Sequence, residues 1–234
     1  MVQFTPPFLL KNKHLQTVYA TFFRKPLKLA TTCEVFELAD GDFIDCYWLN
    51  KPDKGNSTPI VVLFHGLEGS HESPYIQGAM QTLTQGGYAC VLMHFRGCSG
   101  RDNRSPQTYH SGETGDAKAW IEHVKQTFPD TPLYAVGYSL GANMLLKLLG
   151  EYEHQSPLTA VIAISAPMQL DISADAISHG CSRPYERHLL RSLKATLLRK
   201  YKQHDMEALL GKTSEQIKSI RTIREFDDIY TSKI

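Results

Sequence analysis

The chain has 234 residues, of which 42% are hydrophobic and 21% charged, enough to bury one sizeable core. Its 25 lysines and arginines nearly balance its 24 aspartates and glutamates, so no strong field attracts nucleic acid or an anionic membrane. No apolar run approaches the roughly 20 residues of a membrane span. The 5 cysteines lack zinc-ligand spacing, and the first residues do not resemble a signal peptide. We therefore expect a soluble cytoplasmic protein without a nucleic-acid partner, a membrane span or a metal.

The first 59 residues predict a short helix and a β-hairpin. Residues 12–24 have apolar side chains at helical spacing. Two partly alternating runs follow at 34–38 and 43–48, and Asp40-Gly41 between them is a strong turn signal. Residues 51–59 are rich in glycine, proline and polar side chains, which is typical of a loop.

From residue 60 onward, strands alternate with helices. The strands are continuous apolar runs, as expected for strands covered on both faces, and they span 60–64, 88–93, 133–136 and 159–164. The helices between them have apolar stripes and span 75–84, 116–128 and 140–150. This alternation predicts an α/β fold with a mostly parallel sheet between helical layers.

After residue 167 the alternation stops, and residues 170–230 predict helices without a further strand. A long helical segment after the fourth parallel strand is typical of a lid. We therefore expect residues 1–234 to form one domain, with 168–230 as a helical cap and the last core strands missing. The basic residues of this segment are better explained as solvated helix faces than as a binding site. They are Arg183, Arg187, Arg191, Lys194, Arg199, Lys200 and Lys202.

The sharpest chemical motif is Gly137-Tyr138-Ser139-Leu140-Gly141. It follows a buried strand and opens a helix, which is the placement required of a nucleophile elbow. In such an elbow the backbone of the serine is strained and its hydroxyl projects above the sheet, while the glycines keep side chains away from the adjoining strand and helix. The helix N-terminus directs unpaired N–H groups at developing negative charge. We therefore expect Ser139 to be a nucleophile; the alternative is a glycine-rich turn with an incidental serine.

A second motif, residues 65–70, reads His-Gly-Leu-Glu-Gly-Ser and directly follows the strand at 60–64. Acyl transfer turns a carbonyl oxygen into an oxyanion, which preorganised backbone N–H groups must face. We expect these donors to be the amides of Leu67 and Leu140, with His65 and Gly66 shaping the site. Alone, the His-Gly pair is better explained as a strand-ending turn; the predicted elbow favours the oxyanion loop.

Three further segments complete an ordered set with these two motifs: His94-Phe-Arg-Gly-Cys-Ser-Gly100, Tyr109-His-Ser-Gly-Glu-Thr114 and Arg224-Glu-Phe-Asp-Asp228. The set resembles the α/β-hydrolase fold and, more narrowly, the AB hydrolase 4 family of YheT-type bacterial esterase-like proteins and eukaryotic lipases. The similarity runs from about His14 to the last residue. It implies hydrolysis of a small-molecule carboxylic ester by a Ser, Asp, His triad, without a metal or organic cofactor.

The triad acid and base are not evident in the sequence. In α/β-hydrolases they follow the serine, each on a loop after a later core strand. None of the later candidates follows a readable strand; these are His154, His179, His188, His204, Asp227 and Asp228. We therefore expect a chain truncated on its C-terminal side and nearly inactive, because a serine without a base is a poor nucleophile. The strand at 159–164 would then be an unpaired apolar edge.

Three functions remain open. The first is an esterase-like serine hydrolase for esters of short or medium acyl chains, with the apolar helical segment after residue 170 lining the acyl pocket. The second is a non-catalytic binding protein or remnant that keeps the pocket. The third is a thioesterase or acyltransferase, because the choice of acyl acceptor depends on pocket shape.

Charged residues near the predicted site suit structural roles. Arg96 and Arg101 flank the loop after the strand at 88–93 and could contact an anionic substrate, but structural ion pairs are the better explanation. Asp116 precedes an apolar helical stripe, and we expect it to stabilise the helix N-terminus by capping or through the helix dipole.

Overall fold

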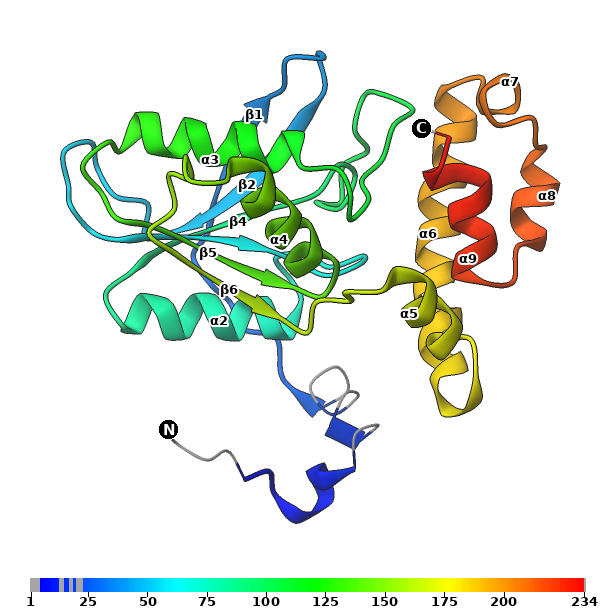
Figure 1. The fold of residues 1–234 in the computed structure, drawn as a ribbon, viewed down its shortest axis with the longest axis horizontal. Helices are drawn as coiled ribbons and strands as arrows, with labels where there is room; N and C mark the ends of the chain where they lie inside the picture. The colour runs from blue at the N-terminus through cyan, green and yellow to red at the C-terminus, as the bar shows by residue number, and fades with distance from the viewer. Residues whose placement is uncertain (1–4, 13–14, 17–18, 20–22, 234) are drawn as a thin grey trace.

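The computed structural model describes residues 5–12, 15–16, 19 and 23–233, and their arrangement is shown in Figure 1. A six-stranded sheet has the strand order β1-β2-β4-β3-β5-β6. The strands are β1 Thr32–Glu37, β2 Phe43–Leu49, β3 Ile60–Phe64, β4 Ala89–Met93, β5 Leu133–Tyr138 and β6 Ala160–Ile164. The last four strands are mutually parallel, whereas β1 and β2 pair antiparallel with their neighbours. The predicted α/β fold with a mostly parallel sheet is confirmed.

The predicted hairpin is also present. Glu37 of β1 lies opposite Phe43 of β2, and the chain turns at Gly41, whose φ of 84° is the left-handed conformation that glycine adopts freely. Strand β2 pairs in turn with β4, so the hairpin extends the parallel strands at one edge of the sheet. The helix predicted over 12–24 lies largely outside the described residues.

Helices cover both faces of the sheet. They are α2 Pro74–Gln85 on one face, and α3 Gly115–Thr127 and α4 Leu140–Tyr152 on the other (Figure 1). From residue 60 to 164, the bounds of the helices and strands differ from those predicted by at most two residues. The predictions were accurate here because the strands are apolar on both faces and the helices on one.

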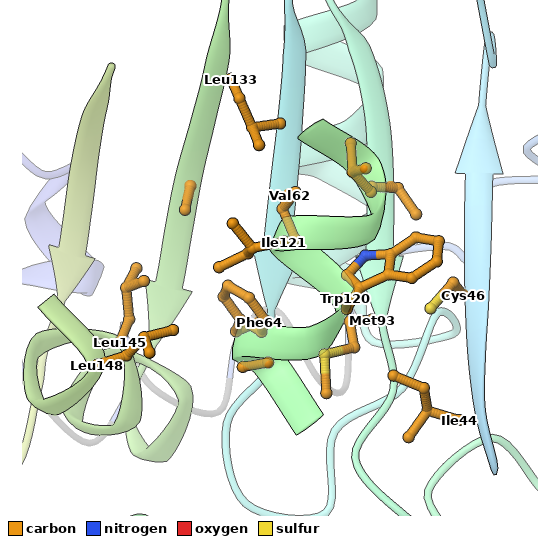
Figure 2. Close-up of a cluster of buried hydrophobic side chains, with 14 of the residues drawn as sticks. Ile44, Cys46, Val62, Phe64, Met93, Trp120, Ile121, Leu133, Leu145 and Leu148 are labelled. Carbon is orange, nitrogen blue, oxygen red and sulfur yellow. The ribbon is translucent and has the colours of Figure 1, made fainter. Parts of the chain in front are cut away.

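Alternate side chains of β3 point to opposite faces of the sheet, as the strand geometry requires. Val62 and Phe64 join the cluster beneath α3 and α4, which contains Trp120 and Ile121 (Figure 2). Val61 lies in the second cluster, beneath α2. The strand that precedes the predicted oxyanion loop is therefore fixed from both sides.

The C-terminal helical segment, residues 170–231, lies beside the carboxyl ends of the parallel strands (Figure 1). It comprises α5 Leu170–Ile177, η2 Gly180–Ser182, α6 Arg183–Gln203, α7 Met206–Leu210, α8 Ser214–Ser219, α9 Ile223–Phe226 and η3 Asp227–Thr231. The segment has its own buried cluster, which includes Leu190, Leu197, Met206 and Ile217. No strand follows β6 in the described part of the segment. Within the described ranges, no helix has the length and hydrophobicity needed to cross a membrane.

Lys200 of α6 corrects the expectation that the basic residues are all solvated. Most of that set is exposed, but Lys200 is only 2% exposed. Its Nζ donates to Asn103 Oδ1 at 2.6 Å and to the carbonyl oxygens of Ser105 and Gln107 at 2.8 and 3.1 Å. Burial lowers the pKa of Lys200 from 10.5 to about 8. The helical segment is thereby tied to the loop after β4.

Strand β6 is the open edge of the sheet. It pairs only with β5 among the described strands, and most of its residues are exposed. Ile162 in its middle is 58% exposed. An exposed apolar edge strand can pair with another chain, which is a common route to aggregation.

We therefore predict that the chain aggregates through β6. Ile162→Lys should raise the concentration at which light scattering appears, by about severalfold, because a charge on an edge strand opposes pairing with a second chain. Leu209→Lys is the matched control, since Leu209 is 53% exposed but lies on α7. Equal effects of the two substitutions, or a chain that stays monomeric without either, would contradict the prediction.

A second prediction concerns Lys200. Lys200→Met leaves the buried Asn103 Oδ1 without its donor and should lower the free energy of unfolding by about 1–3 kcal/mol. Urea unfolding measures this loss. Lys202→Met, an exposed position on the same helix, should change stability by less than about 0.5 kcal/mol. Similar losses for both variants would mean that the buried amine does not hold the segment in place.

Candidate active site

Ser139 joins the end of β5 to the start of α4 in a strained conformation. Its φ of 51° and ψ of −116° are unusual for a residue with a side chain. Its N–H donates to the carbonyl oxygen of Ile164 at 2.9 Å, and its own carbonyl accepts the amides of Ala142 and Asn143, each at 3.0 Å. The backbone is therefore held on both sides while the residue itself is exposed.

Close approach of the backbone explains the glycines around Ser139. A Cβ at Gly137 would lie 2.6 Å from the carbonyl oxygen of Gly141, and a Cβ at Gly141 would lie 2.5 Å from that of His65. A Cβ at Gly66 would lie 3.2 Å from the Cβ of Ser139. Any side chain at 137 or 141 would push α4 away from the ends of β3 and β5.

The amides predicted to bind an oxyanion have no hydrogen-bond partner among the described residues. Leu140 is the first residue of α4, where a helix leaves its N–H groups unpaired. The loop at Leu67 is fixed on either side: the Gly66 N–H donates to the Tyr75 hydroxyl, and the Gly69 N–H donates to the Gly66 carbonyl, both at 2.9 Å. Both leucines line one cavity with Ser139.

His65 is fully buried and makes two contacts that fix the loop. Its Nδ1–H donates to the Gly66 carbonyl at 2.7 Å, and its Nε2 accepts the Phe95 N–H at 3.1 Å. Burial lowers the pKa of His65 to about 4. These are the contacts of a neutral structural histidine that joins the loops after β3 and β4.

His94, directly after β4, is a second buried histidine that joins neighbouring segments. Its Nε2 accepts the His71 N–H at 3.0 Å, and its Nδ1 lies 3.0 Å from the carbonyl oxygen of Asp45. Burial lowers the pKa of His94 to about 3, and the neighbouring His65 acts in the same direction. A neutral His94 thereby connects β2, β4 and the loop that follows residue 70.

A cavity of about 890 Å³ opens between Ser139 and the C-terminal helical segment. Its wall on that side is largely apolar and includes Leu170, Ala174, Ile177, Leu189, Leu193, Ile223 and Phe226. The opposite wall is formed by residues 108–112 and by the two leucines of the predicted oxyanion site. The segment after residue 170 thus lines the same cavity as the serine.

No base is hydrogen-bonded to Ser139 among the described residues. Its hydroxyl makes no hydrogen bond to them, and none of the described histidines later in the chain lines the cavity. Two titratable side chains do line it: His110, which was not a candidate in the sequence, and Asp227, which was set aside because it follows no strand. Burial lowers the pKa of His110 and raises the pKa of Asp227. The only sequence signal for His110 was its place in the segment 109–114, which resembles the family.

The charged residues beside the site form structural ion pairs, as predicted. Both Arg96 Nε and Nη2 donate to the Asp116 carboxylate, at 2.7 and 2.6 Å, and Arg101 pairs with Asp45. The N-terminal amides of α3 are capped by Glu113, whose Oε1 accepts from residues 115 and 116. Asp116 is therefore an ion-pair partner in the first turn of the helix and does not cap it. Within the described ranges, no cluster of three or more acidic, His or Cys side chains could hold a metal.

Comparisons with known proteins agree with this geometry. A family model described as the alpha/beta hydrolase fold matches residues 59–202. The Escherichia coli (strain K12) protein named "Putative esterase YheT" is 42% identical over 232 residues, covering 99% of this chain and 68% of YheT. The Saccharomyces cerevisiae medium-chain fatty acid ethyl ester synthase/esterase 2 is 30% identical over 197 residues, covering 74% of this chain and 43% of that protein. The solved Pyrococcus furiosus esterase Pf2001 shares the fold, with a TM-score of 0.54 and 20% identity over 66% of this chain and 58% of that chain.

The chain is shorter than these relatives. It spans 68% of the length of YheT and between 41% and 60% of the length of seven further curated relatives. The activities in their names therefore belong to proteins longer than this chain.

The two buried histidines predict a pH dependence of stability. Their folded-state pKa values of about 4 and about 3 lie below the ordinary 6.5, so the unfolded chain binds more protons as the pH falls below 6.5. The free energy of unfolding should be highest above about pH 6.5 and fall by roughly 2–4 kcal/mol at about pH 5. Urea unfolding across this range measures the slope. His94→Asn should flatten it, whereas the exposed control His154→Gln should not; equal slopes would contradict the assignment.

Proposed function

Because the chain belongs to the α/β hydrolase fold family, we propose that it carries the nucleophile and oxyanion site of a carboxylic ester hydrolase. The observation that carries the proposal is Ser139. Its backbone lies at a positive φ between β5 and α4, and the residue faces the cavity beside two unpaired amides. An ordinary strand-to-helix turn has no need of this strained arrangement.

The proposed reaction follows from the positions of these groups. Attack forms a bond from Ser139 Oγ to the acyl carbon, moves the carbonyl π pair onto oxygen and releases the hydroxyl proton to a base. Collapse of this intermediate expels the alcohol oxygen, which takes up a proton. Water then repeats the attack on the acyl-serine and frees Ser139. The amides of Leu67 and Leu140 bind the oxyanion in both steps, and loss of one such donor costs about 10²–10³ in kcat.

The cavity favours an ester with an apolar acyl chain. Most of its apolar lining residues belong to the C-terminal helical segment, among them Leu170, Ile177 and Leu193. We propose that this segment, residues 168–230, is the cap of the hydrolase domain and binds a short or medium acyl chain. The Saccharomyces cerevisiae relative is named as both an ester synthase and an esterase. This favours an alcohol as a second acyl acceptor besides water, and attack by an alcohol on the acyl-serine would give acyl transfer in place of hydrolysis.

The described residues also support a non-catalytic alternative. Because no base among them is hydrogen-bonded to the Ser139 hydroxyl, we expect the 234-residue chain to react slowly. A triad acid and base would raise the rate by supplying the missing proton acceptor. A chain that keeps the cavity but has no activated serine would be a binding protein.

We further propose a small-molecule ester as ligand and the reducing cytoplasm as location. All 5 cysteines lie within the described ranges and are free thiols. Burial raises the pKa of Cys90 to about 11, so this thiol stays protonated and unreactive at neutral pH. The formal net charge of +1 gives no electrostatic reason for a nucleic-acid partner.

A fluorophosphonate probe tests the assignment of Ser139. The probe should label the chain slowly, and Ser139→Ala should abolish labelling, because phosphonylation needs a nucleophilic serine next to an oxyanion site. Peptide mapping identifies the labelled residue. The initial rate of 4-nitrophenyl butyrate hydrolysis measures the activity of the chain and of Ser139→Ala. Ser165→Ala is the matched control, since Ser165 also has a positive φ, of 54°, but lies at the end of β6. Absence of labelling would reject the catalytic role and leave the binding protein.

A further inference from the structure

Glu68 connects the predicted oxyanion loop to the C-terminal helical segment. Its φ of 55° places it, like Ser139, in the left-handed region. Its backbone N–H donates to the hydroxyl of Tyr109 at 2.9 Å, and that hydroxyl donates to Glu68 Oε1, also at 2.9 Å. The other carboxylate oxygen, Oε2, accepts the hydroxyl of Ser192 on α6. One side chain therefore joins its own backbone, the sheet side of the cavity and the helical segment.

Tyr109 is a rigid partner for this contact. It is 7% exposed and stacks on Phe95, with ring centroids 5.0 Å apart and an interplanar angle of 7°. Phe95 in turn donates its N–H to His65 at the start of the loop. A positive φ in a residue with a side chain is strained and persists where surrounding contacts impose it. The contacts of Tyr109 and Ser192 are those that hold Glu68.

Leu67 is bound to the same two parts of the molecule. Its side chain packs against the buried cluster under α3 and α4, and also against the cluster inside the helical segment. Leu193, the neighbour of Ser192, belongs to that second cluster and lines the cavity. Residues 67 and 68 thus contact the helical segment by apolar packing and by a hydrogen bond. The peptide bond between Leu67 and Glu68 lies between these two contacts.

We propose that Glu68 is a positioning residue that couples docking of α6 to the orientation of the Leu67 amide. The role of that amide rests on the proposed function. With α6 in place, Ser192 and Tyr109 fix both oxygens of the carboxylate, and the Leu67 N–H stays directed at the cavity. When α6 moves away, Glu68 loses an anchor, Leu67 loses part of its packing, and the loop relaxes from its positive φ. The helical segment therefore governs the oxyanion site as well as the shape of the pocket.

Substitutions at Glu68 separate positioning from a direct effect of its charge. A carboxylate near a developing oxyanion repels it, so a charge effect alone would make Glu68→Ala and Glu68→Gln both faster. Positioning makes the opposite prediction for alanine, which loses both anchors. Glutamine keeps them, because its carbonyl accepts from Tyr109 and its amide donates to the Ser192 oxygen. Glu72→Ala is the matched control: Glu72 is exposed, and its carboxylate makes no hydrogen bond or ion pair among the described residues.

The experiment measures two quantities on the 234-residue chain and its variants. The first is hydrogen exchange of the peptide that contains residues 65–73, which reports the loop whether or not the chain is active. The second is the rate constant for fluorophosphonate labelling of Ser139. We expect Glu68→Ala to speed exchange in this peptide and to slow labelling by about tenfold or more, toward the roughly 10²–10³-fold cost of one lost oxyanion donor. Ser192→Ala, an exposed position, should give smaller changes in the same direction, and Glu68→Gln and Glu72→Ala should stay near wild type.

Each outcome decides the proposal. Unchanged exchange in Glu68→Ala and Ser192→Ala would overturn it, as would labelling of Glu68→Ala at the wild-type rate or faster. If no variant and no wild-type chain is labelled, the proposed function fails, and exchange alone decides the coupling: faster exchange in Ser192→Ala supports it and unchanged exchange overturns it. Should Glu68→Ala fail to fold, Ser192→Ala provides the same two measurements.

Discussion

The close approach of helix α4 to the ends of β3 and β5 is the constraint on which the rest of the site depends. The two backbones pass so near each other that a Cβ at Gly137 or Gly141 would overlap main-chain atoms. This distance brings the first turn of α4 next to the loop after β3, and it forces Ser139 into a positive φ. Leu67 and Leu140 therefore come to line one cavity although they lie 73 positions apart along the chain.

The sequence predicted the parts of the fold that depend on local patterns. The strands from β3 to β6 are continuous apolar runs, and Asp40-Gly41 marks the hairpin, so their positions follow from neighbouring residues. The pairing of β2 with β4 has no such local signal, because the paired residues lie more than 40 positions apart along the chain. The burial of Lys200 was not predicted for the same reason: its acceptors lie almost 100 residues earlier, at residues 103–107.

The parts of the site that depend on local patterns were also predictable, whereas contacts between distant residues were not. The Gly137-to-Gly141 motif indicates a nucleophile elbow because its position between strand and helix can be read from the sequence. The contacts of Glu68 with Tyr109 and Ser192 span 41 and 124 residues, and no short pattern predicts them. Arg96 and Arg101 form ion pairs as expected, whereas capping of α3 by Glu113 depends on a turn whose geometry the sequence does not specify.

The Ser139 N–H donates to the carbonyl oxygen of Ile164, the last residue of β6. The backbone at the elbow is thus attached to the outermost strand of the sheet, whose other side has no neighbour among the described strands. Edge strands fray before central ones, because fewer hydrogen bonds hold them. The order of Ser139 is therefore limited by the order of β6, and whatever protects this edge strand against fraying also keeps the turn between β5 and α4 in place.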